Sequence, residues 1–332
     1  MINKFFLGVL NSLSLLIEIP YTLLFGKARK VEHIWKPVNY QRNNIFFWRL
    51  IQKPLQSRGI YLPLNYKKLH SLNEFQTFHD EHKVINDYLK NYNDFNLENC
   101  FLDIGASDGI DMSNTFNLAL EGYKGFLFEV NSSNFAKLST VYRDFNNVEL
   151  FKTKITPNNV NNLLKALNLP KVIKVLNLDI DSYDYYVLSE LLNSYKFQYL
   201  ILEINPIFPS SIDFTVEYDP QFIWEGNNFQ GVSLSMLYKL LERNNYSIVH
   251  VDRAFALAVN NKYCDDNINK FSIFELEKQL DNSLKNKAPE KWETIYKNFR
   301  NKPEEQIISE INNLFKNYKN YYIKKSGFSK TY

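Results

Sequence analysis

Acidic side chains follow two neighbouring apolar runs of the sequence, and their types and spacing suit a divalent metal ion. Asp179, Asp181 and Asp184 come after one run, and Glu203 and Asn205 end the next. Because ligands bind outside the carboxyl ends of strands in an open α/β sheet, we expect these groups to converge. Ionised carboxylates that share a cleft repel one another unless a cation neutralises them, and oxygen ligands suit Mg²⁺ or Mn²⁺. The predicted metal ligands are Asp179, Asp181, Glu203 and Asn205.

Two interpretations without a metal stay open. Asp181 or Ser182 could simply cap the helix that follows them. Glu203 could act alone as a general base. His250, near the end of a later strand, is a further candidate for the base, although a hydrogen-bonded core histidine is the more ordinary reading. The candidate catalytic residues are therefore Asp179, Glu203 and His250.

A glycine turn earlier in the chain has the composition of a nucleoside site. Asp103 precedes the turn, and Glu129 ends the next apolar run. Turn glycines let the backbone approach a ligand, with helix N–H groups pointing at it. An acidic residue about twenty positions on can accept hydrogen bonds from ribose hydroxyls. Asp103 would repel a pyrophosphate but suits an amino group. The candidate cofactor-binding residues are Asp103, Gly105, Ala106, Ser107, Asp108, Gly109 and Glu129.

The elements that must position these groups alternate between strand and helix patterns, which predicts a parallel sheet with helices on both faces. The last two strands have a short link and read as a hairpin. Residues 206–230 form a long loop that should hang over the site. Strands are expected at 100–104, 125–130, 148–151, 173–179, 198–204, 246–251 and 254–259, and helices at 111–121, 132–141, 158–168, 184–194 and 231–244.

From roughly residue 98 to 260 the chain resembles the FkbM-like group of class I S-adenosylmethionine (SAM) methyltransferases. The resemblance rests on DIGASDGIDMSNTFNLALEGYKGFLFE, LNLDIDSYDYYVL, LILEINPIFPSSIDFTVEYDP and GVSLSMLYKLLERNNYSIV. The family's second motif usually reads DIDGxDY, whereas Ser182 replaces that glycine here. The resemblance implies an α/β, Rossmann-like sheet, mostly parallel with an antiparallel last strand, and the residues outside it predict helical additions at both ends. It also implies SAM as methyl donor and a sugar hydroxyl of a glycan or glycoconjugate as acceptor.

The acidic residues are similar to those of metal-dependent O-methyltransferases of the catechol and macrocin types, where acids after strands four and five hold a divalent ion. Two other functions compete with this one. A non-catalytic SAM-fold module could bind a partner through its helical ends, but it need not keep the glycine turn and the acids. A nucleic-acid methyltransferase is favoured only by the basic C-terminal residues. The net charge of +3 is small, and Glu203-Ile204-Asn205-Pro206 is no Asn-Pro-Pro-Tyr or Pro-Cys site, so nucleic acid is not the expected partner.

The 332 residues divide into four segments: an apolar, amphipathic helix at 1–31, an aromatic-rich helical region at 32–97, the SAM-binding domain at 98–262 and a basic helical extension at 263–332. Lys and Arg outnumber Glu in the last of these, and a solvated helical appendage is the preferred interpretation.

Polar residues interrupt the apolar stretch near the N-terminus, which disfavours a membrane-spanning helix, and no small-residue cleavage site follows it. Residues 3–19 suit a helix that lies in a membrane interface. The alternative is a helix packed on a neighbour or on the partner of a homo-oligomer. Cys100 and Cys264 fit a reducing compartment, so the expected location is cytoplasmic, with any peripheral contact on the inner face of a membrane.

Overall fold

The computed structural model describes residues 81–91, 97–110, 112–263, 268–287, 290–318 and 320–328. The predictions for residues 1–31, including the interfacial helix at 3–19, lie outside these ranges, as do Cys264 and most of 32–97. Helix α4 (Glu81–Asn91) is the described part of that aromatic-rich region. None of the helices within the described ranges combines the length and the apolar character that crossing a bilayer requires.

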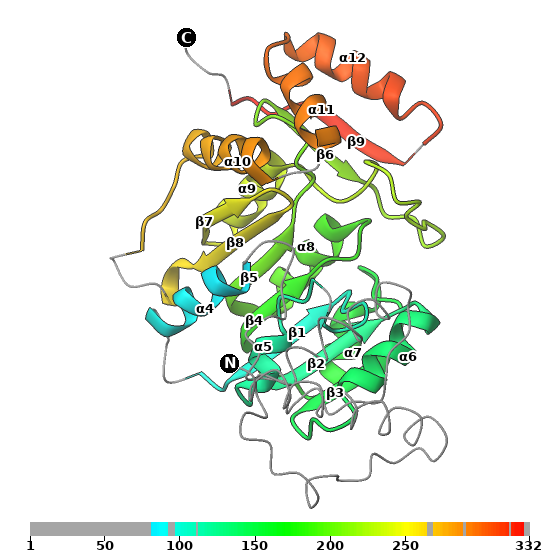
Figure 1. Ribbon diagram of the computed structural model, residues 1–332, viewed down its shortest axis with the longest axis vertical. Coiled ribbons are helices and arrows are strands. Elements are labelled where there is room, and N and C mark those ends of the chain that lie inside the picture. Colours follow the sequence, from blue (N-terminus) through cyan, green and yellow to red (C-terminus); the bar gives the residue numbers. More distant parts are fainter. Residues whose placement is uncertain are drawn as a thin grey trace, which may run out of the picture.

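Seven strands form one sheet in the order β3-β2-β1-β4-β5-β8-β7 (Figure 1). Neighbours from β3 to β5 pair in parallel, and β8 runs antiparallel to both β5 and β7. The fold is therefore Rossmann-like, mostly parallel with an antiparallel last strand, as predicted. The strands are β1 (Cys100–Ile104), β2 (Lys124–Glu129), β3 (Val148–Lys152), β4 (Val172–Leu178), β5 (Lys196–Glu203), β7 (Tyr246–Asp252) and β8 (Phe255–Asn260).

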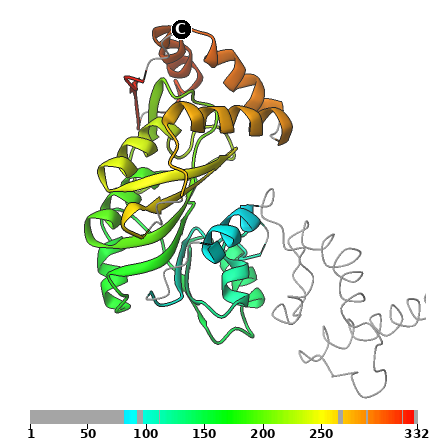
Figure 2. The same cartoon turned by 90° about the vertical axis from the view of Figure 1, so that its left-hand side faces the viewer.

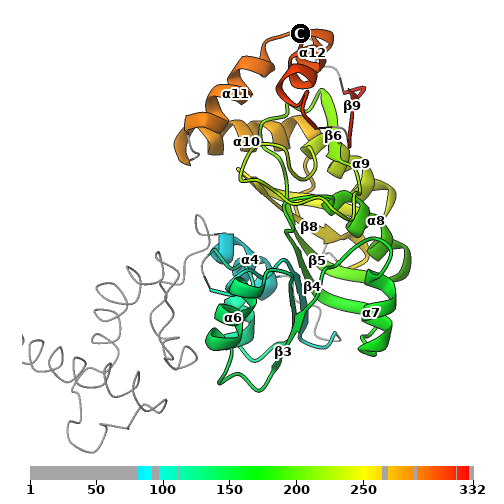
Figure 3. The ribbon, with the colours of Figure 1, turned by 90° about the vertical axis from the view of Figure 1, so that its right-hand side faces the viewer.

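Helices cover both faces of this sheet, as Figure 3 shows from one side and Figure 2 from the other. Helices α5 (Phe116–Leu120) and α6 (Ser132–Val141) share one buried cluster with α4. Helices α7 (Val160–Ala166), α8 (Asp184–Ser194) and α9 (Leu234–Arg243) contribute to the cluster on the opposite face. The central strands are buried on both faces, which explains why they read as nearly continuous apolar runs.

The chain beyond β8 is part of the packed structure, so the expectation of a solvated helical appendage is wrong for its described residues. A short 3₁₀ turn (Asn261–Tyr263) leads away from β8, and α10 (Ile273–Lys287) packs on β7. Helices α11 (Glu290–Arg300) and α12 (Glu304–Leu314) follow. Their buried side chains, among them Phe299 and Ile311, join a third apolar cluster instead of facing water.

A second, two-stranded sheet joins this C-terminal part to the segment after β5 (Figure 1). Strand β6 (Ile212–Val216) pairs antiparallel with β9 (Tyr321–Lys325), with Phe214 opposite Ile323. The sequence predicts an irregular loop over 206–230 and helices at 263–332, and both expectations miss this pairing. Strand β6 is completely buried, and Phe214 stacks on Phe208 with ring centroids 4.2 Å apart.

A candidate active site at the carboxyl ends of β1, β4 and β5

The glycine turn after β1 lies directly against the end of β4. Gly105 has a φ of +96°, and a Cβ built on it would lie 1.6 Å from the backbone oxygen of Asp179. The N–H groups of Gly105 and Ala106 donate to the carbonyl of Phe128, and the Asp179 N–H donates to the carbonyl of Ile104. Any side chain at Gly105 would collide with backbone and would also have to adopt a strained φ. The turn is thereby held beside the acids that follow β4.

The helix expected at 111–121 begins later, at Phe116. The Asp108 carboxylate accepts a backbone N–H two residues on, at 3.0 Å. Ser113 Oγ then accepts the N–H groups of Thr115 at 3.3 Å and of Phe116 at 3.1 Å. Such short polar side chains offer the backbone an alternative to helical hydrogen bonds. The expectation that a helix N-terminus follows the glycine turn directly is therefore wrong.

Asp103 lies beneath the turn and is only 2% exposed. Its two carboxylate oxygens accept hydrogen bonds from Thr115 Oγ1 at 2.5 Å and from Asn177 Nδ2 at 2.8 Å. Burial raises the pKa of Asp103 to about 6, although the two hydrogen bonds act in the opposite direction. These contacts tie the start of α5 and the end of β4 to β1. They favour a supporting role for Asp103 over direct contact with a ligand amine.

Glu129, at the end of β2, lies beside the same turn. Its Oε2 accepts the N–H of Ser107 at 2.8 Å, and its Oε1 accepts the N–H of Asn131 at 2.5 Å. Burial raises the pKa of Glu129, while the backbone hydrogen bonds lower it. Each carboxylate oxygen can accept a second hydrogen bond. Glu129 can therefore hold the turn in place and still accept from the hydroxyls of a ligand.

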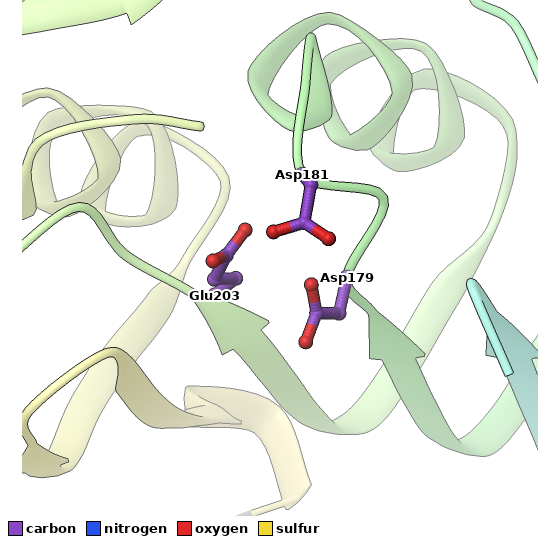
Figure 4. A group of neighbouring side chains, drawn as sticks. All are labelled: Asp179, Asp181 and Glu203. Atoms are coloured by element: carbon purple, nitrogen blue, oxygen red, sulfur yellow. The ribbon is translucent and has the colours of Figure 1, made fainter. Parts of the chain in front are cut away.

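Three carboxylates meet where β4 and β5 end (Figure 4). Asp179 directly follows β4, Asp181 lies two residues later and Glu203 is the last residue of β5. One oxygen of each lies within 4.8 Å of the others, and all three side chains are half-buried. The side chains point toward one another from two neighbouring strands. Three oxygen ligands at this separation suit Mg²⁺ or Mn²⁺.

Asp184, the third acid after β4, has a different role. Its carboxylate accepts the N–H groups of Ile180 and Ser182, both at 2.9 Å, and so closes the loop that carries Asp181. The N-cap residue of helix α8 is Tyr183, whose side chain makes no capping hydrogen bond. Neither Asp181 nor Ser182 is therefore the N-cap residue of this helix. Asp181 has a φ of +53°, a conformation that Asp tolerates better than most residues. The loop thus keeps a tight turn with Ser182 and no glycine.

Gln230 also belongs to this site, and the sequence analysis did not identify it. Its Nε2 donates to Glu203 Oε1 at 2.5 Å, and its side chain is buried. The neighbouring Gly231 donates its N–H to the carbonyl of Ser182 at 3.0 Å. The end of the 206–230 segment therefore returns to the site. There Gln230 contacts Glu203 at the end of β5, and the adjacent Gly231 contacts the loop after β4.

Two candidates from the sequence have other surroundings. Asn205 donates from Nδ2 to the carbonyls of Asn228 and Gln230, and its Oδ1 accepts the N–H of Ile207 at 3.3 Å. These contacts favour a role in shaping the 206–230 segment over metal ligation. His250 lies on β7, which β8 separates from β5, and it is level with Ile201 instead of Glu203, so it is more than roughly 10 Å from Glu203. It does not belong to the acidic cluster.

The three acids share an environment that disfavours ionisation. Burial, followed by the charges of Asp181 and Asp184, raises the pKa of Asp179 well above its usual value. Burial and Asp184 raise the pKa of Asp181 to about 7, and burial and Asp179 raise that of Glu203. Without a cation, ionising all three acids together is therefore unfavourable. A divalent cation would replace any bound protons and relieve the repulsion.

This environment predicts an unusual pH dependence of stability in the metal-free protein. Because the pKa of Asp181 is higher in the folded chain than in the unfolded chain, the folded state binds more protons between about pH 4 and pH 7. The free energy of unfolding should therefore fall as the pH rises through this range. In a chelator, we expect thermal unfolding several degrees lower at pH 8 than at pH 6.

The matched variant for this measurement is Asp181→Asn, since Asn also tolerates the positive φ. It should lose much of the decrease between pH 6 and pH 8, and added Mn²⁺ should reduce the decrease in the wild type. A melting temperature that rises equally with pH in both proteins would contradict the assignment.

Chemically, the arrangement combines a turn suited to a nucleoside with an acidic cluster beside it. The close approach of Gly105 to the Asp179 carbonyl brings the two parts together. A ligand held by the turn and Glu129 would therefore extend toward Asp179, Asp181 and Glu203. The cluster could bind a cation and a hydroxyl, or could take a proton from the hydroxyl through Glu203.

No protein-family model matches the sequence, and no curated protein matches it. Solved structures to which the chain is similar include the N-terminal domain of EvdMO1 in the presence of SAH and D-fucose, at 14% identity and a TM-score of 0.36, covering 56% of this chain and 82% of that one. The bifunctional kinase-methyltransferase WbdD is 14% identical, with 56% and 40% coverage and a TM-score of 0.36. An O-methyltransferase family protein from Burkholderia thailandensis is 9% identical, with 70% and 76% coverage and a TM-score of 0.33. Likenesses this low do not identify an acceptor, and the FkbM-like subfamily stays a prediction.

Proposed function

We propose that the protein is a SAM-dependent O-methyltransferase that acts on a sugar hydroxyl of a glycan or glycoconjugate, with a divalent ion at the acidic cluster. The observation that carries the proposal is the juxtaposition of the glycine turn with three carboxylates whose oxygens lie within 4.8 Å of one another. The sequence motifs that resemble SAM methyltransferases supply the identity of the methyl donor.

In this proposal the turn and Glu129 hold the nucleoside part of SAM. Glu129 accepts from the ribose hydroxyls while its bonds to the N–H groups of Ser107 and Asn131 fix its orientation. Gly105 lets this turn lie directly against the backbone of Asp179, which keeps the nucleoside site beside the acidic cluster. Asp103 supports the turn from below through Thr115.

Asp179, Asp181 and Glu203 would hold Mg²⁺ or Mn²⁺. The ion would lower the pKa of the acceptor hydroxyl and align its oxygen with the methyl group. SAM held at the turn would supply the methyl group: the acceptor oxygen would form a bond to the methyl carbon as the bond between that carbon and sulfur breaks, with S-adenosylhomocysteine as the leaving group. The hydroxyl proton would pass to solvent or to a carboxylate of the cluster; in the absence of a metal, Glu203 would be the general base.

Replacement of Glu129 with Ala tests the cofactor site. The change removes the ribose acceptor and releases the Ser107 N–H, so SAM binding should weaken by about 1–3 kcal/mol, the cost of one lost charge-assisted hydrogen bond. Calorimetry with SAM measures it. Glu149→Ala, on the exposed surface of neighbouring β3, is the matched control and should bind SAM like the wild type. Well-folded wild-type protein that binds no SAM would exclude the proposed function.

The acceptor class needs a separate assay. Transfer of a labelled methyl group from SAM to a panel of soluble oligosaccharides should exceed transfer to DNA or to a small catechol. Preferential labelling of DNA would instead support the competing nucleic-acid function.

A further inference from the structure

Only one carboxylate oxygen of Glu203 accepts a hydrogen bond from the described residues. Its Oε1 accepts from Gln230 Nε2, whereas its Oε2 is buried and accepts no hydrogen bond from the described residues. A Cβ built on Gly231 would lie 3.5 Å from that Oε2, so the backbone of residue 231 lies close to this oxygen as well. Gln230 therefore fixes the orientation of the Glu203 carboxylate, one oxygen of which lies within 4.8 Å of oxygens of Asp179 and Asp181.

The backbone around Gln230 is fixed from three directions. Its carbonyl accepts from Asn205 Nδ2 at 2.9 Å, just beyond the end of β5. The next residue, Gly231, donates to the carbonyl of Ser182 in the loop after β4 and accepts the N–H of Val216 from β6, both at 3.0 Å. A side chain on a segment anchored to β5, to the β4 loop and to β6 cannot shift independently of the site.

We propose that Gln230 is a positioning residue for the metal site: its amide binds Glu203 Oε1 and so presents Oε2 to the cation. This inference rests on the proposed function, because it assumes a divalent ion at the cluster. A neutral amide suits the task, since it donates a hydrogen bond to the carboxylate without adding a fourth negative charge. Partners that orient a ligating carboxylate in this way typically change metal affinity 10–100-fold when they are removed.

The test is calorimetric titration with Mn²⁺ of three full-length variants: Gln230→Leu, Gln230→Glu and the control Gln221→Leu. Gln221 lies on the exposed part of the same segment. We expect Gln230→Leu to bind Mn²⁺ about 10–100-fold more weakly, and Gln230→Glu to bind weakly at pH 8, where the new carboxylate cannot donate. Gln221→Leu should bind Mn²⁺ like the wild type, and SAM affinity should stay unchanged in all three.

A purely structural role for Gln230 makes a different prediction. Such a role would lower the melting temperature of Gln230→Leu but leave the Mn²⁺ affinity of its folded fraction unchanged, and that result would overturn the proposal. If Gln230→Leu does not fold, the near-isosteric Gln230→Glu decides the question by the same measurement.

Titrations of the wild-type protein distinguish the role of Gln230 from the proposed function. Wild-type protein that binds SAM but no Mn²⁺ would overturn the role of Gln230 and leave SAM-dependent methylation standing. Wild-type protein that binds neither would remove the proposed function itself.

Discussion

Replacing Asp179 with Asn should lower methyl transfer by at least about 100-fold while leaving SAM affinity nearly unchanged. The expected size follows from the several kcal/mol that a metal ion contributes by stabilising charge on the acceptor oxygen. Asp179 supplies one of the three clustered carboxylates, so its loss would remove one ligand of the proposed metal ion. Its contact with the glycine turn runs through its backbone oxygen, which Asn retains.

The measurements for Asp179→Asn are turnover with saturating SAM, Mn²⁺ binding and SAM binding. Asp144→Asn, on the surface beside Arg143, is a control for the loss of one charge. Exhaustive chelation should abolish wild-type activity, and Mg²⁺ or Mn²⁺ should restore it. Activity that survives chelation would show that the reaction requires no divalent metal and would leave Glu203 as the preferred general base. Loss of SAM binding in Asp179→Asn would instead place this acid in the cofactor site.

The second large effect is expected for Gly105→Ala, which should abolish SAM binding and destabilise the fold by several kcal/mol. The added Cβ would lie 1.6 Å from the Asp179 carbonyl oxygen, so β1 and β4 would have to separate at the centre of the sheet. Positive φ alone costs a non-glycine residue about 1–2 kcal/mol. The collision must therefore account for the rest of the effect.

Gly122 supplies the matched control for that experiment. It has a φ of +89°, close to the +96° of Gly105, but a Cβ built on it meets no atom within 4 Å. Gly122→Ala should cost only the backbone strain and should bind SAM normally. Chemical unfolding of both variants, together with SAM titration, measures the difference. Equal destabilisation by the two changes would show that the close approach at Gly105 is unimportant.

The strands of the large sheet were predictable because their signals are local. Apolar runs such as the one at β4 are bounded by turn residues, and the glycine turn marks the end of β1. The convergence of Asp179, Asp181 and Glu203 followed from the rule that parallel strands present their carboxyl ends at one edge. The late start of α5 was not predicted, because it depends on which backbone N–H groups donate hydrogen bonds to the side chains of Ser113 and Asp108.

Features that depend on distant contacts could not be read from the sequence. Strand β6 lies in a segment rich in proline and aromatic residues, and its partner β9 is about a hundred residues further along the chain. Gln230 carries no charge and lies in a long loop, so nothing in its neighbours indicates that it meets Glu203. The contacts of Asp103 with Asn177 likewise arise only when β1 and β4 pair.

The pairing of β6 with β9 has a consequence for protein synthesis. A chain emerging from the ribosome folds from its N-terminal side first, so the large sheet can form while β9 is still being translated. Until Tyr321–Lys325 emerges, one edge of β6 stays open and Phe214 lacks its ring contact with Tyr321. Val216, which anchors Gly231 beside Glu203, belongs to that unfinished sheet. We therefore expect the large sheet with its glycine turn to form before the small sheet that supports Gly231 is complete.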